Sequence, residues 1–83
     1  MTGSGKITFY GTTWCGASRR ARQILDQHEI PYQWLDIDRD KAAAEIVRGL
    51  NQGNCTVPTL VWPDGSHLVE PSNQELMLKL GLG

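Results

Sequence analysis

The chain has 83 residues, of which 40% are hydrophobic and 20% are charged, and its net charge is -1. This length supports one domain with a single modest core, so we expect residues 1–83 to form one domain, with residues 1–6 as a loose N-terminal segment. The balanced charge, the lack of any apolar run near the roughly 20 residues that cross a bilayer, and the lack of a signal-peptide pattern favour a cytoplasmic protein with no nucleic-acid or membrane partner.

The first half of the chain alternates between extended and helical patterns. Ile7–Tyr10 are apolar or β-favouring residues that run into a glycine, as in a short buried strand. From Ala17 to His28 the apolar positions recur at helical spacing, which predicts an amphipathic helix. Pro31 ends any helix, and Tyr32–Ile37 resume the extended pattern of a second strand.

A second helix and a third strand follow. Ala42–Leu50 have strong helical propensity, and either Asp38 or Asp40 can cap this helix at its N-terminus. Thr56–Trp62 are rich in β-favouring residues and predict a third extended segment.

The last part of the chain predicts a hairpin and a short helix. Asp64-Gly65 is a turn signal that joins the third strand to His67–Val69. Ser72 and Glu75 have the spacing of a capping box, which leads into a helix over residues 76–80. The order strand, helix, strand, helix, hairpin, helix predicts an α/β fold with a four-stranded mixed sheet flanked by helices.

Cys15 is the most informative residue of the chain. It follows the first strand by a short turn and stands where the first helix begins, where free backbone N–H groups and the helix dipole favour a thiolate. A C-x-x-C redox pair would have its second cysteine at position 18, but the chain has Ser18. A hydroxyl cannot form a disulfide, although it can donate a hydrogen bond to the Cys15 thiolate. The motif therefore indicates a single-thiol redox site.

The chain resembles the glutaredoxin family of the thioredoxin fold over residues 6 to 82. The resemblance is carried by the apolar first strand, the motif Thr13–Ser18, the loop Thr56-Val57-Pro58, the Asp64-Gly65 hairpin and the helix capped by Ser72. Within the family the chain is most similar to mycoredoxins and related small bacterial glutaredoxins, through Ala42–Glu45, Gly53-Asn54 and Pro71-Ser72.

The resemblance implies roles for individual residues. Cys15 would be the nucleophile and Ser18 its catalytic neighbour. Pro58 would be a cis-proline facing the thiol, and the backbone of Val57 would pair with the bound small thiol. The residues implied in binding that thiol are Trp14, Gly16, Thr56, Val57, Pro58, Ser72 and Asn73. The last two would offer helix N-terminal N–H groups to a carboxylate of the ligand.

The chain departs from the family pattern at two positions. Thr12 stands where many glutaredoxins have a lysine, and Cys55 stands where relatives often have an arginine. Arg19 and Arg22 either make the mouth of the site electropositive or form a solvated helix face. Cys55 is either a resolving thiol, which requires its Cα within roughly 7 Å of that of Cys15, or a free thiol without a catalytic role.

We therefore expect a thiol–disulfide oxidoreductase with a monothiol mechanism. Its substrates would be mixed disulfides between proteins and a low-molecular-weight thiol, glutathione or mycothiol, which is also the cosubstrate. We expect a monomer with no tightly bound cofactor and no metal site. One alternative is a carrier of a [2Fe–2S] cluster, and a weaker one is an electron donor to ribonucleotide reductase, which would require a second cysteine in the motif.

Overall fold

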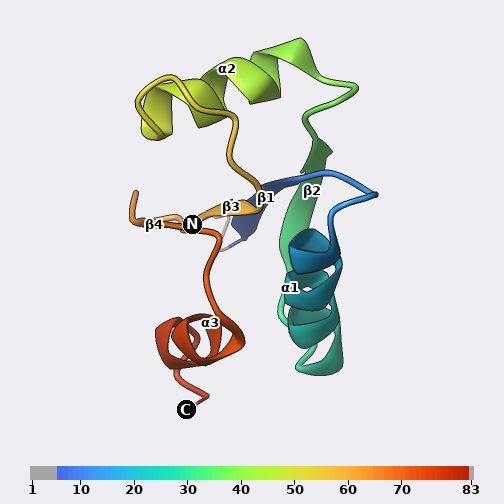
Figure 1. Ribbon diagram of the computed structural model, residues 1–83. Coiled ribbons are helices and arrows are strands. Elements are labelled where there is room, and N and C mark those ends of the chain that lie inside the picture. The colour runs from blue at the N-terminus through green and yellow to red at the C-terminus, as the bar shows by residue number, and fades with distance from the viewer. Residues whose placement is uncertain (1–5, 83) are drawn as a thin grey trace.

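The computed structural model of the chain describes residues 6–82. The expectation of a loose segment at residues 1–6 therefore lies, apart from Lys6, outside the described residues. The elements follow the predicted order (Figure 1) and are β1 Ile7–Gly11, α1 Gly16–Gln27, β2 Tyr32–Asp36, α2 Lys41–Leu50, β3 Thr59–Val61, β4 His67–Val69 and α3 Asn73–Lys79.

The strands form one four-stranded sheet in the order β2-β1-β3-β4. β1 pairs in parallel with β2 and antiparallel with β3, and β3 pairs antiparallel with β4. The sheet is mixed, as predicted, because the helical crossover of α1 returns the chain parallel to β1 while the hairpin reverses it. The predicted fold class is confirmed.

Helices cover both faces of this sheet, with α1 and α3 on one face and α2 on the other (Figure 1). Successive residues of a strand point to opposite faces, and β1 shows this directly. Phe9 is fully buried in the core under α1 and α3, with Leu25 and Leu76, whereas Tyr10 packs with Val47 under α2. β1 is thus the buried centre of the molecule, and its C-terminal end leads straight into the Cys15 turn.

The helix caps follow the polar residues next to each start. Asp40, not Asp38, caps α2, because its carboxylate accepts a hydrogen bond from the N–H of Ala43 at 3.1 Å. The capping box of α3 is confirmed, since Ser72 Oγ accepts from the N–H of Glu75 at 3.1 Å and the Glu75 carboxylate accepts from the N–H of Ser72 at 2.8 Å.

The predicted strand over residues 56–62 is too long at both ends, because β3 covers only Thr59–Val61. Pro58 has no N–H to donate to a strand partner, and the carbonyl of Thr56 accepts the Thr59 hydroxyl at 2.8 Å. At the other end Trp62 belongs to the turn, where its carbonyl accepts the N–H of Gly65 at 2.9 Å. The residues before β3 are therefore a loop, and this loop faces Cys15.

Candidate active site

Cys15 is the residue that opens α1. Its backbone is extended (φ -82°, ψ 120°), and its carbonyl accepts the N–H of Arg19 at 3.1 Å, which starts the helical hydrogen bonding. The thiol makes no capping bond, and the side chain is half-buried. The sulfur is therefore held at the helix N-terminus and remains open to a reagent, as the sequence predicts.

Several groups act on the ionisation of this thiol. Burial raises the pKa of Cys15, but hydrogen bonds from the Ser18 hydroxyl and from the backbone N–H groups of Ser18 and Ala17 outweigh it, so the pKa lies below the ordinary value of a cysteine. The negative charge of Glu70 opposes this lowering of the pKa. A larger fraction of Cys15 is thus thiolate at neutral pH, and the thiolate is the nucleophile.

Ser18 lies directly behind the thiol and is 0% exposed. Among residues 6–82 its hydroxyl has no partner at full hydrogen-bond geometry, so its proton is available for the weaker interaction with the sulfur. A Cβ on Gly11 would stand 2.9 Å from Ser18 Oγ and 2.9 Å from Trp34, so only glycine at the end of β1 allows α1 to approach this closely. Thr12, at the position where many glutaredoxins have a lysine, is also buried, and its hydroxyl likewise has no partner within the described residues.

The loop before β3 faces the thiol. The peptide bond between Val57 and Pro58 is cis, which confirms the predicted cis-proline, and the ring of Pro58 is fully buried. Cys15 Sγ lies 4.0 Å from the carbonyl oxygen of Val57. The fold thus brings Cys15 and the Val57-Pro58 step together, although 42 residues separate Cys15 from Val57.

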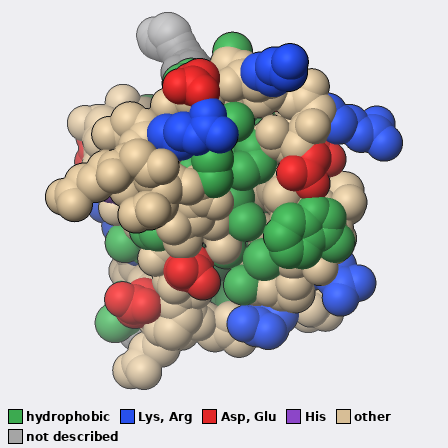
Figure 2. Space-filling model, turned by 45° about the horizontal axis from the view of Figure 1, so that its top comes forward, with side chains coloured by type: hydrophobic (Ala, Val, Ile, Leu, Met, Phe, Trp, Pro, Cys, Tyr) green, Lys and Arg blue, Asp and Glu red, His purple; other side chains and the backbone are tan. Residues whose placement is uncertain are grey.

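Trp14 forms an exposed aromatic rim next to Cys15. Its side chain is 70% exposed, yet its indole N–H donates a hydrogen bond of 2.7 Å to the carboxylate of Asp38. Sequence reasoning missed this role of Asp38 and considered it only as a helix cap. The signal was available, because parallel strands β1 and β2 end at the same edge of the sheet and Asp38 closely follows β2. Figure 2 shows hydrophobic side chains gathered into a patch on one face, with acidic and basic side chains around it.

The start of α3 differs from the expected carboxylate site. The N–H of Ser72 is bonded to the Glu75 carboxylate at 2.8 Å, so a ligand carboxylate would have to displace Glu75 to reach it, and the binding role of Ser72 stays a prediction. Asn73 begins α3, a helix of 7 residues, and its role in binding stays a prediction. Gly16 is exposed and Thr56 is half-buried, and their binding roles also stay predictions.

The second cysteine contacts a different part of the fold. Cys55 is exposed, and its sulfur lies 3.9 Å from the carbonyl oxygen of Ala44 on α2. Both cysteines are free thiols. The resolving role of Cys55 remains a prediction.

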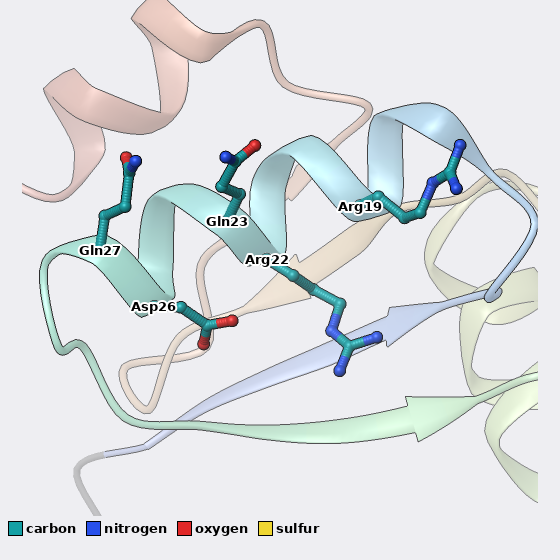
Figure 3. A pocket seen from close by; sticks show the side chains of 5 residues that line it. All are labelled: Arg19, Arg22, Gln23, Asp26 and Gln27. Carbon is teal, nitrogen blue, oxygen red and sulfur yellow. The ribbon is translucent and has the colours of Figure 1, made fainter.

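Arg19 and Arg22 of α1 line a shallow hollow along the helix together with Gln23, Asp26 and Gln27 (Figure 3). Arg22 points toward the sheet, where its guanidinium lies 4.1 Å from the centre of the Trp34 ring. It also approaches the hydroxyl of Tyr32, which in turn donates to Asp26 at 2.9 Å. Arg22 thus packs over the sheet, and Glu70, not Arg19 or Arg22, is the charged residue that shifts the pKa of Cys15.

No helix within residues 6–82 combines the length and the apolar character needed to span a membrane. The same part of the chain contains no group of three or more histidine, cysteine or acidic side chains arranged to hold a metal ion.

The mixed sheet with its central β1, together with a helix-start thiol facing a cis-proline, defines the thioredoxin fold class of redox proteins. The T8A mutant of the thioredoxin-like protein BC3987 has the same fold, with a TM-score of 0.78 at 23% identity over 90% of this chain and 99% of that chain. The glutaredoxin family model matches residues 7–68. The chain belongs to the glutaredoxin family and is a thiol–disulfide oxidoreductase.

Two relatives are similar over most of the chain. The Mycobacterium tuberculosis protein named "Putative glutaredoxin Rv3198A" is 45% identical over 74 residues, which are 89% of this chain and 88% of that protein. Mycoredoxin 1 of Corynebacterium glutamicum is 38% identical over 74 residues, which are 89% of this chain and 91% of that protein.

Proposed function

We propose that the protein reduces mixed disulfides between proteins and a low-molecular-weight thiol by a monothiol mechanism. The observation that carries this proposal is the position of Ser18, whose hydroxyl supports the Cys15 thiolate from the place where a dithiol enzyme has its resolving sulfur. With oxygen instead of sulfur at that place, Cys15 has no partner within its own motif with which to form a disulfide.

The reaction proceeds by two exchange steps. The Cys15 thiolate attacks the small-thiol sulfur of the mixed disulfide, the original S–S bond breaks, and the protein thiolate leaves and takes up a proton. Cys15 is then bonded to the small thiol. A second small thiol, as its thiolate, attacks the small-thiol sulfur of this bond, so that a symmetrical small-molecule disulfide leaves and the Cys15 thiolate is restored. Each cycle therefore consumes one free small thiol, and the disulfide that leaves joins this thiol to the one removed from the protein.

The cosubstrate binds where the site residues surround the sulfur. Trp14 covers one side, Gly16 leaves the helix start open, and the backbone of Val57 beside Pro58 pairs with the extended part of the thiol. Thr56, Ser72 and Asn73 complete the set of binding residues. The cosubstrate is glutathione or mycothiol, and similarity to Mycoredoxin 1 supports mycothiol. The protein acts as a cytoplasmic monomer.

The test is reduction of one model protein carrying either a glutathione or a mycothiol mixed disulfide, with the matching free thiol in excess. The wild type and Cys55→Ser should both release the small thiol at similar rates, whereas Cys15→Ser should release none. Cys55→Ser is the matched control because it removes the other free thiol. Loss of activity in Cys55→Ser, with the small thiol trapped on Cys15, would show that Cys55 resolves the intermediate and would contradict the monothiol mechanism.

A second candidate function is carriage of a [2Fe–2S] cluster, favoured by the single half-buried thiol at the mouth of the site. Thiolate sulfur is the donor that such clusters use, so Cys15 fits as the one ligand from each of two protomers, with two small thiols as the others. Anaerobic purification with the small thiol distinguishes the two functions. A coloured dimer that Cys15→Ser abolishes would favour the carrier, and a colourless monomer with reductase activity would favour the enzyme.

A further inference from the structure

Glu70 has an unusual and well-defined position beside the active site. It follows β4 directly, and because Val69 pairs with Thr59 the next residue stands opposite Pro58. The N–H of Glu70 donates to the carbonyl of Pro58 at 2.8 Å. Its backbone lies in the left-handed region (φ 47°), which non-glycine residues occupy rarely, and the hydrogen bond to Pro58 holds it there. The carboxylate therefore projects from a fixed backbone next to the cis-proline loop.

Within residues 6–82, no salt bridge neutralises the charge of Glu70. The residue is exposed, and the salt bridge that the described residues form lies elsewhere, between Arg48 and Glu45 on α2. Arg19, at the first turn of α1, lines the hollow on that helix, and Arg22 stacks on Trp34. The field of Glu70 reaches the sulfur, where it raises the pKa of Cys15 against the stronger opposing effect of the hydrogen bonds.

A second carboxylate, that of Glu75, lies in the first turn of α3, which follows Glu70 closely in the chain. Glu75 occupies the N–H of Ser72, at the helix start where a ligand carboxylate was expected to bind. The chain thus places its own acidic groups, Glu70 and Glu75, around the position expected for an acidic ligand. A bound thiol with a carboxylate near its sulfur would meet repulsion there, because like charges near a protein surface interact unfavourably until salt screens them.

We propose that Glu70 is a specificity-determining residue that disfavours disulfides whose small-thiol half carries a carboxylate and favours those whose small-thiol half is neutral or cationic. This inference deepens the proposed function and rests on it. Beside the Cys15 sulfur, the Val57-Pro58 loop carries no charged side chain that could distinguish one small thiol from another, whereas Glu70 does.

Three small disulfides of similar size test the proposal: dithiodipropionate, which is anionic, hydroxyethyl disulfide, which is neutral, and cystamine, which is cationic. The second-order rate constant of Cys15 with each is measured for Glu70→Gln and its parent, both on a Cys55→Ser background. The readout is the ratio of the rate constant with dithiodipropionate to the rate constant with cystamine. Changes in the thiolate fraction or the nucleophilicity of Cys15 affect both rate constants equally and cancel in this ratio. We expect this ratio to rise about fivefold in Glu70→Gln and the increase to vanish near 1 M salt, where the Debye length is about 3 Å.

Glu29→Gln is the matched control. Glu29 is also exposed and also left-handed (φ 54°), but it follows the far end of α1 from Cys15. The proposal is overturned if Glu70→Gln leaves the ratio unchanged or if Glu29→Gln changes it equally. Failure of the parent protein to react with any of the three disulfides would instead overturn the proposed function, and the charge preference with it.

A second measurement avoids disulfide chemistry. Iodoacetate and iodoacetamide alkylate a thiolate alike but differ by one negative charge, so their rate ratio at Cys15 reports the local field directly. Glu70→Gln should raise the iodoacetate to iodoacetamide ratio in low salt, and an unchanged ratio would contradict the role of Glu70 at the sulfur.

Discussion

The indole of Trp14 and the carboxylate of Asp38 form a hydrogen bond of 2.7 Å across the carboxyl ends of β1 and β2. This bond holds a largely exposed aromatic ring in one place beside the nucleophile. An exposed side chain without such a bond would sample several rotamers and would have to be ordered when a substrate binds.

Replacing Asp38 should therefore weaken substrate binding more than chemistry. We expect Asp38→Ala to raise KM for the mixed disulfide about three- to tenfold, because one hydrogen bond to a charged acceptor is lost and the ring becomes mobile, while kcat stays nearly constant. Asp38→Asn keeps a hydrogen-bond acceptor, so its KM should lie between that of the wild type and that of Asp38→Ala. The NMR signal of the Trp14 indole N–H, assigned with Trp14→Phe, should broaden or shift in Asp38→Ala, and an unchanged signal would rule out this role.

Ser18→Ala should raise the pKa of Cys15, because it removes the hydroxyl that supports the thiolate. The pH profile of Cys15 alkylation in a Cys55→Ser background measures this, and its midpoint should move to higher pH. Stability should change by no more than about 1 kcal/mol, since the buried hydroxyl has no full hydrogen bond to lose.

The stability of the same variant has a pH dependence of definite sign. A thiol whose pKa is lower in the folded than in the unfolded state binds fewer protons when the protein is folded. The free energy of unfolding therefore rises with pH between the folded-state pKa and the unfolded-state pKa. This stabilisation is lost as the pH falls through the folded-state pKa. Ser18→Ala narrows the interval between the folded-state and unfolded-state pKa of Cys15. The free energy of unfolding measured with urea should therefore rise less with pH in this variant than in the wild type. A larger rise would contradict the direction of the shift.

Ser18→Cys should convert the site to a dithiol. The new sulfur would lie behind Cys15 and could displace a bound protein through an internal disulfide, so direct reduction of protein disulfides should become faster. Insulin reduction measures this activity, and mass spectrometry should show the internal disulfide. No gain in rate would count against the role assigned to Ser18.

Gly11→Ala should destabilise the protein by about 1–3 kcal/mol, because a methyl group there overlaps Ser18 Oγ and the Trp34 ring and forces α1 to shift. Gly49→Ala is the control. It lies in α2 with no atom within 4 Å of the added Cβ and should be neutral or stabilising, by up to about 1 kcal/mol. Urea unfolding curves measure both effects, and equal stability of the two variants would show that the tight contact at Gly11 is not required.

Much of the fold was predictable because its signals are local. Hydrophobic periodicity places each helix and strand, a side-chain oxygen before a helix caps it, and the Ser72–Glu75 spacing closes a capping box, all within a few residues. The position of Cys15 at the start of α1 follows from the same short-range pattern. The cis-proline came from the family resemblance rather than from periodicity.

The amino-acid sequence by itself determined the order of the elements and the placement of one activated thiol at a helix start, since backbone preference and side-chain spacing act between near neighbours. Only the tertiary structure decided what surrounds that thiol. Asp38 reaches Trp14 because two parallel strands end at one edge, Glu70 reaches the site because β4 pairs with β3 beside Pro58, and Arg22 is drawn over the sheet by the Trp34 ring. These contacts depend on how distant segments pack, and no local pattern encodes them.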